Sequence, residues 1–190
     1  MERVRFHQPE WPRTRCVVHL VSGWRRGLAL TLVLSTLAVA GVLAYRHLES
    51  ASAQSATTLE LARLDGSGQA RLADWQGTPV VVNLFASWCP ACLTEMPAFE
   101  RASHDYAGRV VIVGVDSQDS TQAGLQLARD LGITYPLLAD TKSADLYRLL
   151  QGDGMPVTAF ISRKGAVARV YSGELDEALL RQLTDQLLQT

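Results

Sequence analysis

Cysteine is scarce in this sequence, which has three cysteines and four histidines in 190 residues. Cys89 and Cys92 form one close pair, and Cys16 lies near the N-terminus. A zinc site needs a second pair of ligands and the sequence after Tyr45 offers none, so neither a metal nor another cofactor is expected. The chain after Tyr45 also lacks an excess of basic residues, because it has 12 Lys and Arg and 17 Asp and Glu. This balance argues against nucleic acid as a partner.

The one long hydrophobic run covers residues 27–45, which are 19 residues without a charge. This length suffices for a helix to cross a bilayer, so the run predicts a transmembrane segment. Six arginines and two glutamates precede it, and this positive balance predicts that residues 1–26 are cytoplasmic and that the rest is exported. Residues 51–53 (Ala-Ser-Ala) also fit a signal-peptidase site. The run is longer than a usual signal core, so we favour an uncleaved signal anchor, with cleavage as the alternative.

Residues 46–56 are small and polar, which is typical of a linker, so the folded domain is expected over residues 57–190. Strand-like apolar runs alternate there with helical patterns, which predicts an α/β sheet with helices on both faces. A β-hairpin at each end of this pattern makes the sheet mixed. Residues 133–139 predict a strand in which Pro136 favours an edge position or an irregular start. Residues 174–188 predict the last helix.

The residues that carry chemistry are Cys89 and Cys92, which follow a buried strand predicted over residues 80–86. A helical pattern begins at Cys89, and the positive end of a helix favours a thiolate over a thiol. We therefore expect Cys89 to attack a disulfide and Cys92, one turn later, to resolve the mixed disulfide. Trp88 is a candidate docking surface for the substrate. The alternative is a purely structural disulfide, whose short loop would restrict the unfolded chain only slightly.

Residues 83–97 resemble the active-site stretch of the TlpA/ResA-like membrane-anchored thioredoxins, in the AhpC/TSA–Redoxin-like superfamily. Gly154-Met155-Pro156-Val157-Thr158 resembles the loop that carries their cis-proline. The resemblance covers residues 57–188 and implies a thioredoxin fold with an extra α/β insertion at residues 116–139. It also implies that the Met155–Pro156 bond is cis. In this family the loop faces the disulfide, where it binds substrate backbone and keeps metals off the thiols.

Glu95 matches by position the glutamate that the ResA-like proteins keep near their cysteines. It lies three residues after Cys92, close to the same face of the helix. A carboxylate there can move a proton to or from the resolving thiol, and partial burial would raise its pKa. The alternative is a solvated helix glutamate. Asn83 stands where cytoplasmic thioredoxins carry a buried aspartate, which favours Glu95 as the base.

The chain departs from the family in the dipeptide between the cysteines. The family usually has proline directly before the second cysteine, whereas here Pro90 follows the first and Ala91 precedes the second. Because this dipeptide tunes thiolate stability and hence the reduction potential, the direction of electron flow stays open.

The sequence therefore predicts an extracytoplasmic thiol–disulfide oxidoreductase, held in the cell membrane by residues 27–45. It is expected to reduce disulfides of exported proteins such as apocytochrome c, with electrons from a transmembrane thiol carrier. Two alternatives are a disulfide oxidase with the same fold and a non-enzymatic thioredoxin-like binding module.

Overall fold

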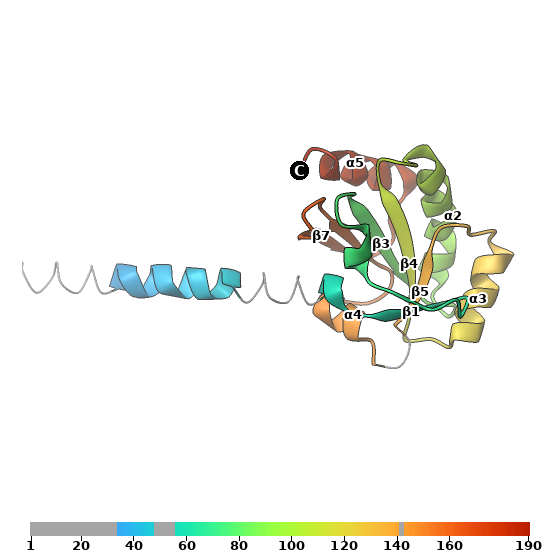
Figure 1. Cartoon of the computed structure of the whole chain (residues 1–190), viewed down its shortest axis with the longest axis horizontal. Coiled ribbons are helices and arrows are strands. Elements are labelled where there is room, and N and C mark those ends of the chain that lie inside the picture. The colour runs from blue at the N-terminus through green and yellow to red at the C-terminus, as the bar shows by residue number, and fades with distance from the viewer. Residues whose placement is uncertain (1–33, 48–55, 141–142) are drawn as a thin grey trace, which may run out of the picture. The chain divides into compact units, whose positions relative to one another are not determined.

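A computed structural model describes residues 34–47, 56–140 and 143–190 of the chain (Figure 1). The chain divides into two units, Met1–Arg46 and His47–Thr190. The predicted cytoplasmic segment 1–26 and most of the predicted linker lie outside the described residues.

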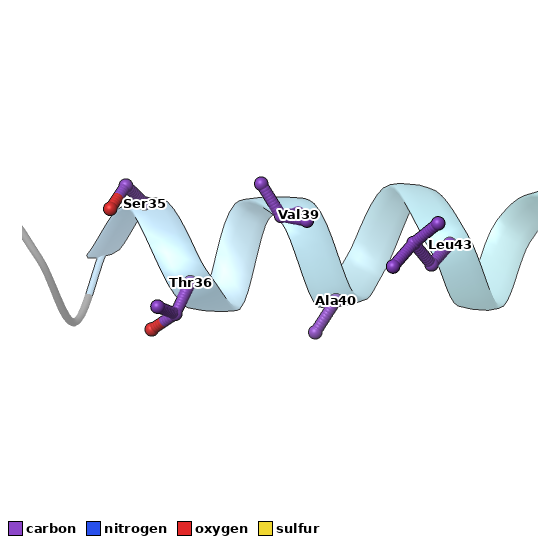
Figure 2. A pocket seen from close by; sticks show the side chains of 5 residues that line it. All are labelled: Ser35, Thr36, Val39, Ala40 and Leu43. Atoms are coloured by element: carbon purple, nitrogen blue, oxygen red, sulfur yellow. The ribbon is translucent and has the colours of Figure 1, made fainter.

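Residues 34–47 form a helix, and one side of it carries a hollow (Figure 2). The hollow is lined by Ser35, Thr36, Val39, Ala40 and Leu43 and contains none of the residues predicted to carry chemistry. The predicted membrane span begins before this helix, and its residues 27–33 lie outside the described ranges. Among the residues that are described, no helix has both the length and the hydropathy that a membrane crossing requires.

The second unit is built on a seven-stranded mixed sheet in the order β2-β1-β5-β4-β3-β6-β7. Strands β3, β4 and β5 pair in parallel, and the remaining pairs are antiparallel. The sheet is therefore mixed and has a hairpin at each edge, as the sequence predicts. The strands are β1 (Leu61–Arg63), β2 (Gln69–Ala70), β3 (Val80–Phe85), β4 (Val111–Ser117), β5 (Leu137–Asp140), β6 (Val157–Ile161) and β7 (Val167–Ser172).

Helices cover both faces of the sheet. On one face, α2 (Pro90–Asp105) and α5 (Glu177–Leu187) pack together over the side chains of Val81, Ile112 and Phe160. Near the cysteines, α3 (Thr121–Asp130) completes this layer. The short helices η1 (Leu72–Trp75) and α4 (Asp145–Leu149) pack on the other face.

The centre of the sheet positions the cysteines. Every residue of β3 is buried, as expected for a central strand whose two faces are both covered, and Asn83 is its one polar residue. The chain leaves β3 through a short turn and enters α2, where Pro90 occupies the first helical turn and fits because its missing N–H has no partner there. Pro97 lies inside α2, which nevertheless continues to Asp105. The cysteine pair therefore lies at the carboxyl end of the central strand.

Two predicted elements differ in detail from those observed. Strand β5 begins at Leu137, directly after Pro136, so the irregular start is confirmed. The edge position is wrong, because β5 pairs with β1 on one side and β4 on the other. The last helix begins at Glu177 and not at residue 174, because the Asp176 side chain caps it by accepting from the N–H of Leu179 at 2.7 Å. Leu175 therefore lies before the helix and its N–H is available to another partner.

Candidate active site

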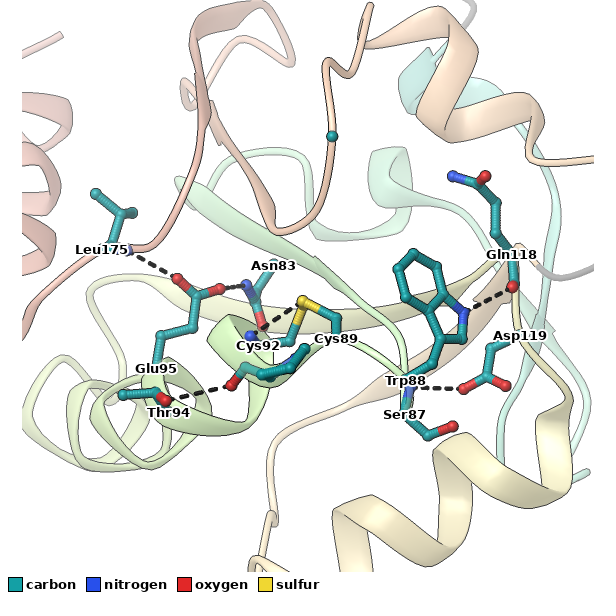
Figure 3. The surroundings of a disulfide bond; sticks show 12 residues. Asn83, Ser87, Trp88, Cys89, Cys92, Thr94, Glu95, Gln118, Asp119 and Leu175 are labelled. Carbon is teal, nitrogen blue, oxygen red and sulfur yellow. Dashed lines mark hydrogen bonds between the residues drawn. A yellow bond between two sulfur atoms is a disulfide. The ribbon is translucent and has the colours of Figure 1, made fainter.

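Cys89 and Cys92 form a disulfide at the N-terminus of α2 (Figure 3). Cys89 is the N-cap residue with an extended backbone, and its sulfur accepts a hydrogen bond from the N–H of Cys92 at 3.1 Å. Both cysteines are buried, but Cys89 keeps a small exposure of 3%, whereas Cys92 has none. In the reduced protein, the same N–H and the positive helix end would stabilise a thiolate on Cys89.

A buried carboxyl group lies one helical turn after Cys92. Glu95 is 2% exposed, and both of its oxygens accept hydrogen bonds. The amide nitrogen of Asn83 on β3 donates to Oε1 at 2.7 Å, and the N–H of Leu175 donates to Oε2 at 2.8 Å (Figure 3). The solvated-helix alternative for Glu95 is therefore wrong, because three separate segments of the chain enclose it.

Burial sets the protonation of Glu95. Removal from water disfavours the charged form and raises the pKa of Glu95 to about 7. The hydrogen bonds from Leu175 and Asn83 act in the opposite direction, and the negative charge of Glu174 adds to the rise. A carboxyl group with a pKa near neutrality can both release and accept a proton under physiological conditions.

Trp88 is held at the surface beside the cysteine pair. Its side chain is 56% exposed, and its indole N–H donates to the backbone carbonyl of Gln118 at 3.1 Å (Figure 3). The preceding residue is held as well, because the N–H of Ser87 donates to Asp119 Oδ2 at 2.6 Å. The loop after β4 thus contacts both residues that lead into Cys89.

The loop before β6 carries the predicted cis bond. The peptide between Met155 and Pro156 is cis, as the family resemblance implies. Met155 is half-buried and packs against the cluster of side chains that includes both cysteines, and Pro156 is buried at the start of β6. The chain therefore brings Cys89, the start of α2 and residues 155–156 to one end of the sheet.

Sequence reasoning missed two carboxylates beside this site. Asp116 is fully buried on β4 and has no hydrogen-bond partner for either oxygen among the described residues. Burial, and then the nearby charge of Asp119, raise the pKa of Asp116 to about 7. Their position in the sequence could have revealed them. Asp116 and Asp119 lie at the carboxyl end of β4, which runs parallel to β3. The carboxyl ends of parallel strands meet at one edge, which is where such folds place their sites.

A cysteine pair that begins a helix after the central strand of a mixed sheet, with a cis-proline loop packed nearby, defines a thioredoxin-fold thiol–disulfide oxidoreductase. The chain belongs to the AhpC/TSA family, whose sequence model matches residues 53–170.

Known proteins of the same kind are similar to this chain. The thiol:disulfide interchange protein DsbE of Escherichia coli (strain K12) is 28% identical over 181 residues, which cover 80% of this chain and 88% of DsbE. Thioredoxin-like protein YneN of Bacillus subtilis (strain 168) is 28% identical over 136 residues, 70% of this chain and 78% of YneN. The structure of MTB dsbF in its mixed oxidized and reduced forms superposes with a TM-score of 0.64 at 25% identity, over 71% of this chain and 97% of dsbF.

Proposed function

We propose that this protein is a TlpA/ResA-like, membrane-anchored reductase of disulfides in exported proteins. The observation that supports reduction over oxidation is the charge of the side chains near Cys89 and Cys92. Two carboxyl groups lie close to the segment that carries the pair: Glu95 is one helical turn after Cys92, and Asp119 accepts from the N–H of Ser87, two residues before Cys89 (Figure 3). A pair becomes strongly oxidising when its reduced form is stabilised by a low-pKa thiolate, and nearby carboxylates oppose that stabilisation. This environment favours a reductant.

The proposed reaction starts from the dithiol. The Cys89 thiolate attacks one sulfur of the substrate disulfide, which forms a mixed disulfide and releases the other substrate sulfur as a thiolate. Cys92 then attacks the Cys89 sulfur, which releases the second substrate thiolate and leaves the Cys89–Cys92 disulfide. The substrate gains two electrons and the protein loses two. A thiol electron donor in the membrane then returns the pair to the dithiol.

Glu95 is proposed as the base for the second attack. The Cys92 thiol is buried and must lose its proton before it can act as a nucleophile. Glu95 lies at i+3 from Cys92 on α2, and its raised pKa suits it to take that proton near neutral pH. Asn83 and the N–H of Leu175 hold the carboxyl in place throughout.

Three residues are proposed to bind the substrate. Trp88 provides an exposed aromatic surface beside Cys89. Met155 packs against the cysteine cluster from the other loop, and Pro156 follows it. A substrate backbone lying between Trp88 and the Met155–Pro156 loop would bring its disulfide to Cys89.

The proposed compartment rests on residues 1–56. Residues 27–45 are proposed to anchor the chain in the cell membrane, with residues 1–26 in the cytoplasm and 46–56 as the linker to the exported domain. A reporter enzyme that is active only outside the cytoplasm, fused after Thr190, tests this topology. Activity of the fusion is expected, and it should be lost when two arginines are introduced into the run.

The direction is tested by the reduction potential of the pair. A value near or below that of thioredoxin, about −270 mV, is expected for a reductase, and a value near about −120 mV would show an oxidase. The oxidase is the second candidate because Pro90 directly follows Cys89, as in oxidising members of the superfamily.

The proposed substrate is tested with an oxidised Cys-x-x-Cys-His peptide, which mimics the haem-attachment site of apocytochrome c. The dithiol form is expected to reduce this peptide faster than a disulfide peptide of the same composition in scrambled order. Equal rates would refute apocytochrome c as the preferred substrate while leaving the reductase intact. If the dithiol form reduces neither peptide nor insulin, and the disulfide form does not oxidise a reduced peptide either, the chain is a binding module.

A further inference from the structure

The loop that follows β4 is hydrogen-bonded to the two residues that precede Cys89. Asp119 Oδ2 accepts from the N–H of Ser87 at 2.6 Å, and the carbonyl of Gln118 accepts from the indole N–H of Trp88 at 3.1 Å (Figure 3). We call Gln118 and Asp119 the clasp. Its two bonds join segments that are 32 and 30 residues apart in the chain, and they hold both the backbone and the ring of the residues just before the nucleophile.

We propose that Asp119 is a positioning residue for substrate docking: by fixing the Ser87–Trp88 backbone, it holds the Trp88 ring where a protein substrate binds. The inference rests on the docking role proposed above for Trp88. It adds a residue that belongs to a different element and does not itself touch the cysteines.

The ordinary role for an aspartate at this position is to cap the following helix, but that role is already filled. Ser120 is the N-cap of α3, and its hydroxyl accepts from the N–H of Ala123 at 3.2 Å. Asp119 Oδ1 accepts from the adjacent N–H of Ser120 at 2.7 Å. The other oxygen is therefore used for a contact with the active-site segment.

The backbone of the clasp is also held in an unfavourable conformation. Gln118 has φ of 58°, in the left-handed region that residues other than glycine rarely adopt. This conformation accompanies the hydrogen bond that its carbonyl accepts from the indole of Trp88. A strained residue persists where the surrounding contacts enforce it, and such residues concentrate at functional sites.

Asp119 is ionised when the enzyme works. Partial burial acts to raise its pKa, but the hydrogen bonds from Ser87 and Ser120 outweigh burial, and the pKa of Asp119 lies below its ordinary value. The bond to Ser87 is therefore charge-assisted, which makes it stronger than a bond between neutral groups.

An ordered Trp88 reduces the entropy that a substrate must overcome. An exposed side chain that is immobilised only on binding weakens association, whereas one already held by the protein does not. Loss of the clasp is therefore expected to raise the KM for a protein disulfide by about 3- to 10-fold. The kcat should not change, because the cysteines and Glu95 keep their contacts.

The test uses the full chain and two substrates, insulin and the small disulfide of 2-mercaptoethanol, which offers no protein surface for Trp88 to bind. The variants are Asp119→Ala, Trp88→Ala and the double variant. Asp130→Ala is the matched control, because Asp130 is an exposed aspartate of α3 that accepts one hydrogen bond, from Gln126 at 2.8 Å. Thermal unfolding of each variant establishes that it is folded.

Asp119→Ala is expected to raise the insulin KM by the stated factor, and to change the rate with the small disulfide by less than about 2-fold. In the Trp88→Ala background it should add nothing further, because Asp119 acts through Trp88. Asp130→Ala should match the wild type. Trp88→Phe keeps an aromatic ring but removes the N–H that donates to the Gln118 carbonyl, together with part of the ring surface, and should raise the insulin KM even if Asp119→Ala does not fold.

Three outcomes overturn the inference alone, and a fourth overturns it together with the docking role of Trp88. An equal loss of rate with both substrates shows that Asp119 acts on Cys89 and not on docking. Additive effects of Asp119→Ala and Trp88→Ala show that Asp119 acts independently of Trp88. If Trp88→Ala raises the insulin KM but Asp119→Ala does not, Trp88 docks substrate without the clasp. If Trp88→Ala itself leaves the KM unchanged, the docking role proposed for Trp88 fails together with the inference.

Discussion

Replacing Glu95 by glutamine tests whether burial keeps this carboxyl near neutrality. Glutamine has the same shape, and its oxygen can accept from the N–H of Leu175 as Glu95 does. Its NH₂ group needs an acceptor, and Asn83 Oδ1 has no partner among the described residues. A rotation of the Asn83 amide would present that oxygen to the new NH₂ group, so the variant should fold with the same contacts.

The expected effect follows from the pKa. Folding raises the pKa of Glu95 from its ordinary value of 4.5 to about 7, because burial disfavours the charged form. A shift of one pKa unit corresponds to about 1.4 kcal/mol. The raised pKa of Glu95 therefore makes about 3 kcal/mol of the free energy of unfolding depend on pH. The folded pKa is the higher one, so this stability is fully present below pH 4.5. It is lost as the pH rises between 4.5 and about 7.

The assay is urea unfolding of the oxidised full chain in mild detergent at intervals from about pH 4.5 to about pH 8. The free energy of unfolding of the wild type should fall by about 3 kcal/mol more than that of Glu95→Gln across this range. Asp116 titrates in both proteins, so the difference isolates Glu95. Glu174→Gln is the matched control, because it removes a charge that raises the pKa of Glu95 and leaves the carboxyl itself in place.

Glu174→Gln should keep the pH dependence and move it to slightly lower pH. If Glu95→Gln instead shows the same pH dependence as the wild type, the folded pKa of Glu95 is ordinary. Burial would then not tune this group, and its proposed role as the base for Cys92 would lose its physical basis.

Four further results are expected. Cys89→Ser should abolish insulin reduction, whereas Cys92→Ser should accumulate a mixed disulfide that is visible on a non-reducing gel, because only the resolving step is lost. Glu95→Gln should shift the pH dependence of thiol alkylation in the reduced protein, and an unchanged profile would contradict its role as base. Asp116→Asn should stabilise the protein at about pH 8 by at least about 1 kcal/mol in urea unfolding, because ionisation of a buried carboxyl without a partner costs more than an unpaired amide. Gly124→Ala should destabilise it by about 1–3 kcal/mol in the same assay despite the better helix propensity of alanine, because the added Cβ would lie 2.4 Å from the Asp116 carboxyl; a more stable variant would show that Asp116 moves freely.

Local sequence patterns were sufficient for the outline of the fold. A continuous β-branched run predicts a central strand because burial on both faces demands apolar residues at every position, and β3 is buried throughout. The cysteine spacing at the start of a helical pattern predicts a closed pair at a helix N-terminus, because both features depend on residues close together in the chain. The cis bond before Pro156 came from the family resemblance and not from local physics.

The environment of the pair was decided by tertiary structure. Leu175 donates to Glu95 across 80 residues, and Ser87 donates to Asp119 across 32. No local pattern encodes such contacts, because they depend on which strand ends and helix starts the folded sheet brings to one edge. The sequence by itself therefore determined which two residues form the disulfide. Only the tertiary structure buried Glu95 near them and brought the clasp of Gln118 and Asp119 to the segment before Cys89. Burial and long-range hydrogen bonds exist only once the helices pack on the sheet.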